Sequence, residues 1–274
     1  MVNESFTLEQ PDFALFLSRL TKELKDREFN YVLVGGIAVQ SHIAHALTTQ
    51  HDTNLLDLEK RVGNFKLSYH LRPTDDVNLC LPEISIERSN DEIKRIYDLL
   101  GSITGNDDGL FYSLDEKPII KIRLQRKGHV NPAFEISVDG ERERRLTLTI
   151  NRNERKAKQG LLTELPKERY IELFDRATTL SIPYCTNKRE DQVSLDLRVI
   201  SPEDLIIIKL AQGRAPDFDD IIKLLAQFKR SGREVNQDRI RSVLSEPHPI
   251  YKVQNQDLLN AYEHFQGIME ALRQ

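Results

Sequence analysis

Hydrophobic positions near the N-terminus follow first a helical and then a strand-like spacing. Apolar residues three and four apart, with Lys and Asp between them, predict an amphipathic helix over Phe13–Glu28. The β-branched run Tyr31–Val34 predicts a strand that stops at Gly35 and Gly36, and Ile37–Leu47 returns to a helical pattern. The first predicted unit is therefore a strand, a Gly-Gly pair and a helix.

Further along the chain the pattern changes to alternation. From Asp76 onward, polar and apolar residues alternate within Arg72–Leu81, which predicts a half-buried strand. The segment His51–Tyr69 is polar and mixed, and we expect an insertion or a long loop there. The other predicted elements are helices at Asp91–Leu100 and Glu168–Thr179, a hairpin formed by Ile119–Gln125 and Ala133–Val138, and short strands at Ile182–Cys185 and Leu195–Ile200.

The last quarter of the chain is helical in pattern. Ser201 is a favourable N-cap, Pro202 suits the first helical position, and acids follow in the first turn, so a helix is predicted from there to Gly213. Three more helices are predicted at Phe218–Lys229, Asn236–Leu244 and Gln256–Leu272. We therefore expect an α/β (α+β) fold, with a mixed β-sheet and flanking helices over residues 1–200 and a helical domain over residues 201–274.

Composition narrows the class of protein. The chain has 274 residues, 39% hydrophobic and 30% charged, which is ordinary for a soluble globular protein. A formal net charge of -4 gives no global preference for nucleic acid or an acidic membrane surface. The longest apolar stretches are far shorter than the roughly 20 residues of a membrane helix, and no signal peptide is visible, so we expect a cytoplasmic protein.

The first candidate metal-binding residues lie on the strand predicted within Arg72–Leu81. Residues two apart on a strand share a face, so Asp76 and Asn78 are expected side by side, with Glu135 of a later strand as a third ligand. Oxygen ligands of this kind suit Mg²⁺, or Mn²⁺, beside nucleotide phosphates. Gly35 and Gly36 could let backbone N–H groups approach a phosphate at the start of a helix. Taken alone, each signal has a plain structural reading, as a turn or a solvated strand face.

The order of these parts resembles the nucleotidyltransferase superfamily that includes DNA polymerase β. Its hallmark is Gly-Gly or Gly-Ser, then Asp-x-Asp, then a third Asp or Glu. The closer resemblance is to minimal nucleotidyltransferases, including toxins of abortive-infection (type IV) toxin–antitoxin systems. Residues Tyr31–Val39 and Arg72-x-Thr74-x-Asp76 match their early motifs. A later pattern is matched by Ser201, Pro202, Glu203, Asp204, Leu205, Lys209, Arg214, Asp217 and Asp220.

This resemblance implies a function and a set of roles. A nucleoside monophosphate would pass from a nucleoside triphosphate to RNA such as a tRNA end, to a protein or to a small molecule, and an antitoxin protein could be a partner. Metal would bind to Asp76, Asn78 and Glu135. Phosphates would contact Gly35, Gly36, Arg72, Thr74, Lys209 and Arg214, and the catalytic residues would be Asp76, Glu135 and Lys209.

Asn78 departs from the family pattern, because it stands where the second aspartate is expected. An amide is a weaker Mg²⁺ ligand than a carboxylate. The chain could therefore be an adapted enzyme or a catalytically degenerate nucleotide-binding or regulatory module. Asp57-Leu-Glu59 also has an acid-x-acid form, but Arg72 and Thr74 favour Asp76.

Two more alternatives remain open in the sequence. Lys209 lies on a largely apolar helix, where its stem could extend to the surface or its ammonium could meet a triphosphate. Asp217 and Asp220 are three residues apart on the next helix. They could orient Lys209 or Arg214, or only complement the positive end of that helix. Arginines and lysines in Glu141–Lys158 offer the best local site for RNA, although a solvated face is the default.

Overall fold

The structure is a computed structural model, and it describes residues 6–63, 66–74, 76–80, 95, 98–99, 111–112, 133–138, 144–151, 172–185, 192–245 and 255–271. The chain is a mixed α/β protein with one seven-stranded sheet, in the order β3-β4-β5-β2-β1-β7-β6. Its strands are β1 Val32–Val34, β2 Asp76–Cys80, β3 Phe111–Tyr112, β4 Ala133–Val138, β5 Arg144–Asn151, β6 Thr178–Cys185 and β7 Gln192–Val199.

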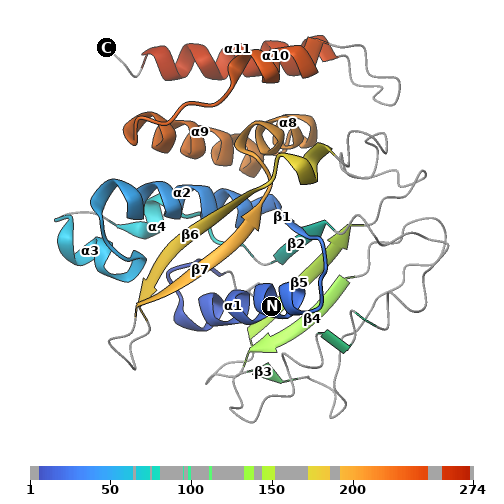
Figure 1. Ribbon diagram of the computed structural model, residues 1–274. Helices are drawn as coiled ribbons and strands as arrows, with labels where there is room; N and C mark the ends of the chain where they lie inside the picture. The colour runs from blue at the N-terminus through green and yellow to red at the C-terminus, as the bar shows by residue number, and fades with distance from the viewer. Residues whose placement is uncertain are drawn as a thin grey trace.

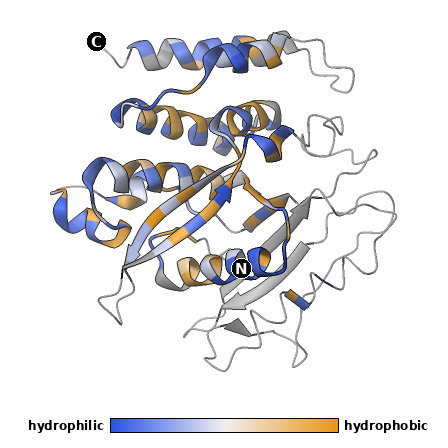
Figure 2. Ribbon diagram, viewed as in Figure 1, coloured by the Kyte–Doolittle hydropathy of each residue, from blue (hydrophilic) through white to orange (hydrophobic). Residues whose placement is uncertain are grey.

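The sheet is mixed because two of its strand pairs are parallel. β1 pairs with β7 and β2 pairs with β5 in parallel, whereas β1–β2, β3–β4, β4–β5 and β6–β7 are antiparallel. The hairpin of β6 and β7 shows the expected alternation, which can be followed along both strands in Figure 2. Leu195 and Leu197 are buried there, whereas Ser194 and Asp196 are exposed.

Helices surround the sheet in successive layers. α1 (Pro11–Asp26) contacts β7, and α2 (Gly35–His51) contacts β1, β2 and β6. α8 (Pro202–Gln212) and α9 (Ala215–Arg230) pack on α2, and α10 (Gln237–Ser245) and α11 (Asn255–Ala271) form the layer beyond them (Figure 1). Within the described part of the chain, no helix is both long and apolar enough to cross a membrane.

The predicted helices of the last quarter are confirmed, and the ends of α8 have the predicted chemistry. The Ser201 hydroxyl accepts a hydrogen bond from the Asp204 backbone N–H at the start of α8. Gly213 ends the helix with a left-handed φ of 62°, which favours glycine. The division into domains at residue 200 remains a prediction.

The expectation of a long loop over His51–Tyr69 is wrong. α2 extends to His51, and the following residues form η1 (Leu55–Asp57), α3 (Leu58–Arg61) and α4 (Leu67–His70). The leucines of these short helices explain the difference, because Leu55, Leu58 and Leu67 are buried in the core. They are too widely spaced to produce a visible period within a polar segment.

One further expectation needs correction. The helix predicted over Glu168–Thr179 ends before Thr178, where β6 begins, because this stretch continues in the β6–β7 hairpin. β4 pairs with β3 and β5, and its predicted hairpin partner Ile119–Gln125 lies outside the described residues. The helix predicted over Asp91–Leu100 also lies mostly outside them.

His42 of α2 is buried in the neutral form. Its side chain is fully enclosed, and its Nε2 lies 2.8 Å from the carbonyl oxygen of Ile200. Burial lowers the pKa of His42 to about 4, and the charge of Arg233 contributes in the same direction. Because the unfolded chain then binds more protons between pH 6.5 and 4, stability is complete above the unfolded pKa and falls as the pH drops through this window.

The expected effect is a loss of about 3 kcal/mol of unfolding free energy from His42 alone between pH 7 and pH 4. Urea denaturation of the wild type and of His42→Gln at several pH values measures this contribution. The variant should have a shallower pH dependence, whereas His264→Gln, at an exposed position, should keep the slope of the wild type. Parallel curves for wild type and His42→Gln would contradict the assignment.

Candidate functional site

The Gly-Gly pair lies where β1, β2 and α2 meet. β1 ends at Val34, which is opposite Asn78 in the antiparallel register, and α2 begins at Gly35 with a φ of 69°. A Cβ atom on Gly35 would lie 2.9 Å from Nδ2 of Asn78. One on Gly36 would lie 2.9 Å from Oγ1 of Thr74. The close approach of these side chains, together with the positive φ, explains why two glycines stand here.

Arg72 completes this group. Its Nη2 atom would lie 3.4 Å from a Cβ atom on Gly36. Thr74 is held in place because its backbone N–H and C=O both bond Phe6, at 2.9 and 2.6 Å. Five residues predicted from separate stretches of sequence, Gly35, Gly36, Arg72, Thr74 and Asn78, are therefore brought together at the start of α2.

Substitution of Gly36 tests this close packing. Alanine within a helix is usually more stable than glycine by up to about 1 kcal/mol. Gly36→Ala should instead lower the free energy of unfolding by about 1–3 kcal/mol, because Thr74 has little freedom to move away from the added methyl group. Gly267→Ala in α11 is the matched control, since nothing lies within 4 Å of its Cβ position. Thermal or urea unfolding of both variants measures the difference, and a stabilised Gly36→Ala would contradict the packing.

The predicted acids are placed by the register of three neighbouring strands. Asp76 of β2 and Glu135 of β4 both pair with Thr147 of β5, so the three residues form one row across the sheet. Strand spacing puts the two outer backbones roughly 9–10 Å apart. Their side chains lie outside the described residues, so the shared metal site remains a prediction. Among the residues that were described, no group of three or more His, Cys, Asp or Glu could hold a metal ion.

Thr147 was missed in the sequence because its strand was not predicted. β5 falls inside the basic run Glu141–Lys158, which was expected to be a solvated face. The structure makes it an internal strand of the sheet, between β2 and β4. The alternation Leu146-Thr-Leu-Thr-Ile150 was the available signal.

Asp57 and Glu59, the alternative acid pair, both form hydrogen bonds with neighbouring residues. Asp57 accepts hydrogen bonds from Asn54 at 2.6 Å and from Lys60 at 3.1 Å. Glu59 accepts one from the backbone N–H of Leu67 at 2.7 Å. These contacts order the short helices after α2, which gives both carboxylates a structural use away from the start of α2.

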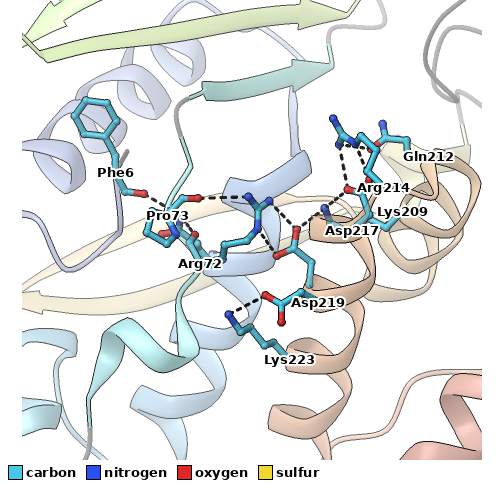
Figure 3. A network of polar contacts seen from close by, with 11 residues as sticks. Phe6, Arg72, Pro73, Lys209, Gln212, Arg214, Asp217, Asp219 and Lys223 are labelled. Atoms are coloured by element: carbon cyan, nitrogen blue, oxygen red, sulfur yellow. Dashed lines mark hydrogen bonds and ion pairs between the residues drawn. The ribbon is translucent and has the colours of Figure 1, made fainter. Parts of the chain in front are cut away.

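A buried ion network connects Arg72 with the C-terminal helices (Figure 3). Arg72 donates two hydrogen bonds to the carboxylate of Asp220, at 2.7 and 2.8 Å. Lys209 of α8 lies 2.7 Å from Asp220 and 3.1 Å from Asp217. Arg214, the N-cap of α9, lies 2.7 Å from Asp217. Three cations thus share these two carboxylates.

Burial makes this network unusual. Lys209, Asp217 and Asp220 are each at most 2% exposed, so the ammonium of Lys209 does not extend to the surface. Burial opposes ionisation of Asp217, but the hydrogen bond from Arg214 and the charge of Lys209 outweigh it and lower its pKa. The hydrogen bonds that Arg72 donates to Asp220 raise the pKa of Arg72. Asp217 and Asp220 therefore hold Lys209, Arg72 and Arg214 in place, in addition to any effect on the helix terminus.

Comparison with known proteins adds little to this site. No family model matches the sequence, and no curated protein matches it. Among solved structures, the solution structure of the antibiotic-resistance factor ANT(2'')-Ia aligns with 95% of this chain and 96% of its own, at 8% sequence identity and a TM-score of 0.37. With a likeness this low, the function of the chain has to be argued from its own residues.

Proposed function

We propose that this protein is a metal-dependent nucleotidyltransferase whose site lies at the start of α2. The observation that carries the proposal is the meeting of Gly35 and Gly36 with Asn78, Thr74 and Arg72. This group adjoins the row that runs from Asp76 to Glu135. The residues proposed to bind phosphate and the acids proposed to bind metal would thus lie at the same end of β2.

The residues at this site fit a hard cation. Two carboxylates and an amide oxygen, from Asp76, Glu135 and Asn78, are the oxygen ligands that Mg²⁺ or Mn²⁺ prefers. A bound ion would neutralise charge on the transferring phosphoryl group. The chain's own contribution would be to orient the triphosphate with the backbone of Gly35 and Gly36, with Thr74, and with the cations Arg72, Lys209 and Arg214.

The proposed reaction is a single displacement at phosphorus. A hydroxyl oxygen of the acceptor forms a bond to the α-phosphorus of a nucleoside triphosphate, and the bond from that phosphorus to the bridging oxygen breaks. Pyrophosphate leaves, and the hydroxyl proton passes to a carboxylate or to water. RNA, a protein side chain and a small molecule all offer such hydroxyls. The resemblance to toxin–antitoxin proteins adds an antitoxin as a proposed protein partner. The cytoplasm, expected from the sequence, is the proposed compartment.

A second candidate function is a nucleotide-binding or regulatory module without turnover. Two observations favour it. Asn78 replaces an acid, and the buried cation Lys209 already has two carboxylate partners, so it is not poised in an open site. This module would bind a nucleoside triphosphate with weak dependence on metal.

The deciding experiment combines purified protein with each radiolabelled nucleoside triphosphate, Mg²⁺ or Mn²⁺, and mixed tRNA, protein and small-molecule acceptors. Transfer of label to one acceptor class supports the enzyme and identifies that class. Metal-insensitive binding of a triphosphate without transfer supports the binding module. If the protein neither bound nor transferred any of the four triphosphates, both proposed functions would be overturned.

A further inference from the structure

A pocket of about 180 Å³ lies away from the site at the start of α2. It is lined by the end of α9, by the turn that follows α9, and by α11. Asp220 of the ion network lies roughly 8–12 Å along the axis of α9 from Leu225 and Phe228 of the pocket, and no residue of the network lines the pocket. The pocket plays no part in the proposed nucleotidyl transfer.

Arg233 is a cation of this pocket that has no anionic partner among the residues that the structure describes. No carboxylate in the described part of the chain forms an ion pair with it, and its Nη1 is buried without a hydrogen-bond partner. Its guanidinium instead lies 4.8 Å from the ring centre of Phe228. Burial also lowers the pKa of Arg233, with no opposing effect from a neighbouring acid. By contrast, Arg72 and Arg176 both bond carboxylates.

The rest of the lining suggests what would neutralise Arg233. Leu225, Phe228 and Val235 provide apolar surface, while Gln237 and Gln266 provide amide groups. Lys229 and Glu234 also line the pocket. A guanidinium binds a carboxylate through two parallel hydrogen bonds, and buried cations are stabilised when such a partner is present.

We propose that this pocket binds a small organic carboxylate, with its charged group on Arg233 and its apolar part on Leu225, Phe228 and Val235. A single guanidinium without a carboxylate partner matches the charge of a monoanion better than that of a multiply charged phosphate. The apolar lining favours a ligand with a hydrocarbon part over an inorganic ion. The proposal is independent of the nucleotidyl-transfer site.

Titration of the full chain with sodium benzoate, followed by NMR, tests this proposal. Saturable shifts of residues lining the pocket are expected. Affinity should fall by about tenfold or more in Arg233→Gln, because the bidentate charge-assisted pair is lost. Arg230→Gln is the matched control, since this exposed arginine lies three positions away, and it should bind benzoate as the wild type does. Benzyl alcohol, which has a similar shape without the charge, should bind at least about tenfold more weakly than benzoate.

Folding of the variants is checked in the same samples. Arg233→Gln removes a cation that has no carboxylate partner in the described residues and loses only the contact with the Phe228 ring, so its melting temperature without benzoate should stay close to that of the wild type. Arg233→Lys keeps the charge but loses the planar fork, and intermediate affinity is expected from it. Absence of saturable benzoate binding would overturn the proposal, as would equal affinity in wild type and Arg233→Gln, or equal affinity for benzyl alcohol. Phosphate binding stronger than benzoate binding would reject the carboxylate class.

Discussion

Replacing Asp220 by alanine is expected to lower the free energy of unfolding by about 3–5 kcal/mol. Its carboxylate is 1% exposed and accepts both hydrogen bonds from Arg72, and it lies 2.7 Å from the ammonium of Lys209. Without it, Asp217 alone would remain for the buried Lys209 and the neighbouring Arg214. The cost arises because Lys209 stays buried after one of its partners is removed, not because the intact network is itself strongly stabilising.

Asp219→Ala is the matched control, one residue earlier on the same helix. The carboxylate of Asp219 is 50% exposed and lies 2.9 Å from Lys223, and an exposed pair of this kind contributes at most about 1 kcal/mol. Urea denaturation of both variants and the wild type measures the difference, with an unchanged denaturant slope showing that the same surface is exposed on unfolding. Equal, small losses for the two variants would show that the network adapts without Asp220.

The ion network also marks the limit of what the sequence could predict. The pattern around Lys209, Asp217 and Asp220 suggested that the acids orient Lys209 or Arg214, and the structure contains those contacts. Nothing in the sequence predicted the contact between Arg72 and Asp220, which are 148 positions apart. Contacts of that separation depend on how α9 packs on α2, and local spacing contains no information about such packing.

Local signals gave the most accurate predictions. The strand, the glycine pair and the helix that follows were all visible, because the change from a β-branched run to glycine occurs within a few residues. The start of α8 was equally visible, since Ser201 and Pro202 are specific to the first turn of a helix. β5 and the short helices after α2 were missed, because their burial depends on partner strands and on single leucines that reach a distant core.

The position of Asn78 bears directly on the choice between enzyme and binding module. Asn78 pairs with Val34 in the register, and its amide lies against Gly35, at the first turn of α2. An aspartate at position 78 would place a negative charge beside the positive end of this helix, which is favourable by about 0.3–1 kcal/mol. Asn78→Asp should therefore fold, and its effect on activity reports on the chemistry of the site.

Asp76→Asn is expected to reduce the proposed nucleotidyl transfer by about 100-fold or more, because it removes a carboxylate proposed to bind the metal while keeping the side chain's shape. Initial rates of label transfer, measured across Mg²⁺ and Mn²⁺ concentrations, test this expectation. Thermal unfolding should change little, which separates a catalytic defect from a folding defect. An active Asp76→Asn variant would place the metal ligands elsewhere and contradict the proposed site.

Asn78→Asp in the same assay distinguishes an adapted enzyme from a catalytically degenerate module. In an adapted enzyme, the amide belongs to the working geometry, and a second carboxylate should lower an existing rate. In a degenerate module, the wild type is inactive and the added carboxylate supplies the missing ligand, so transfer should appear in Asn78→Asp and disappear again in the double variant with Asp76→Asn. Dependence of any gained activity on Asp76 is the essential result, because both residues lie on β2 and only a shared ion requires them together.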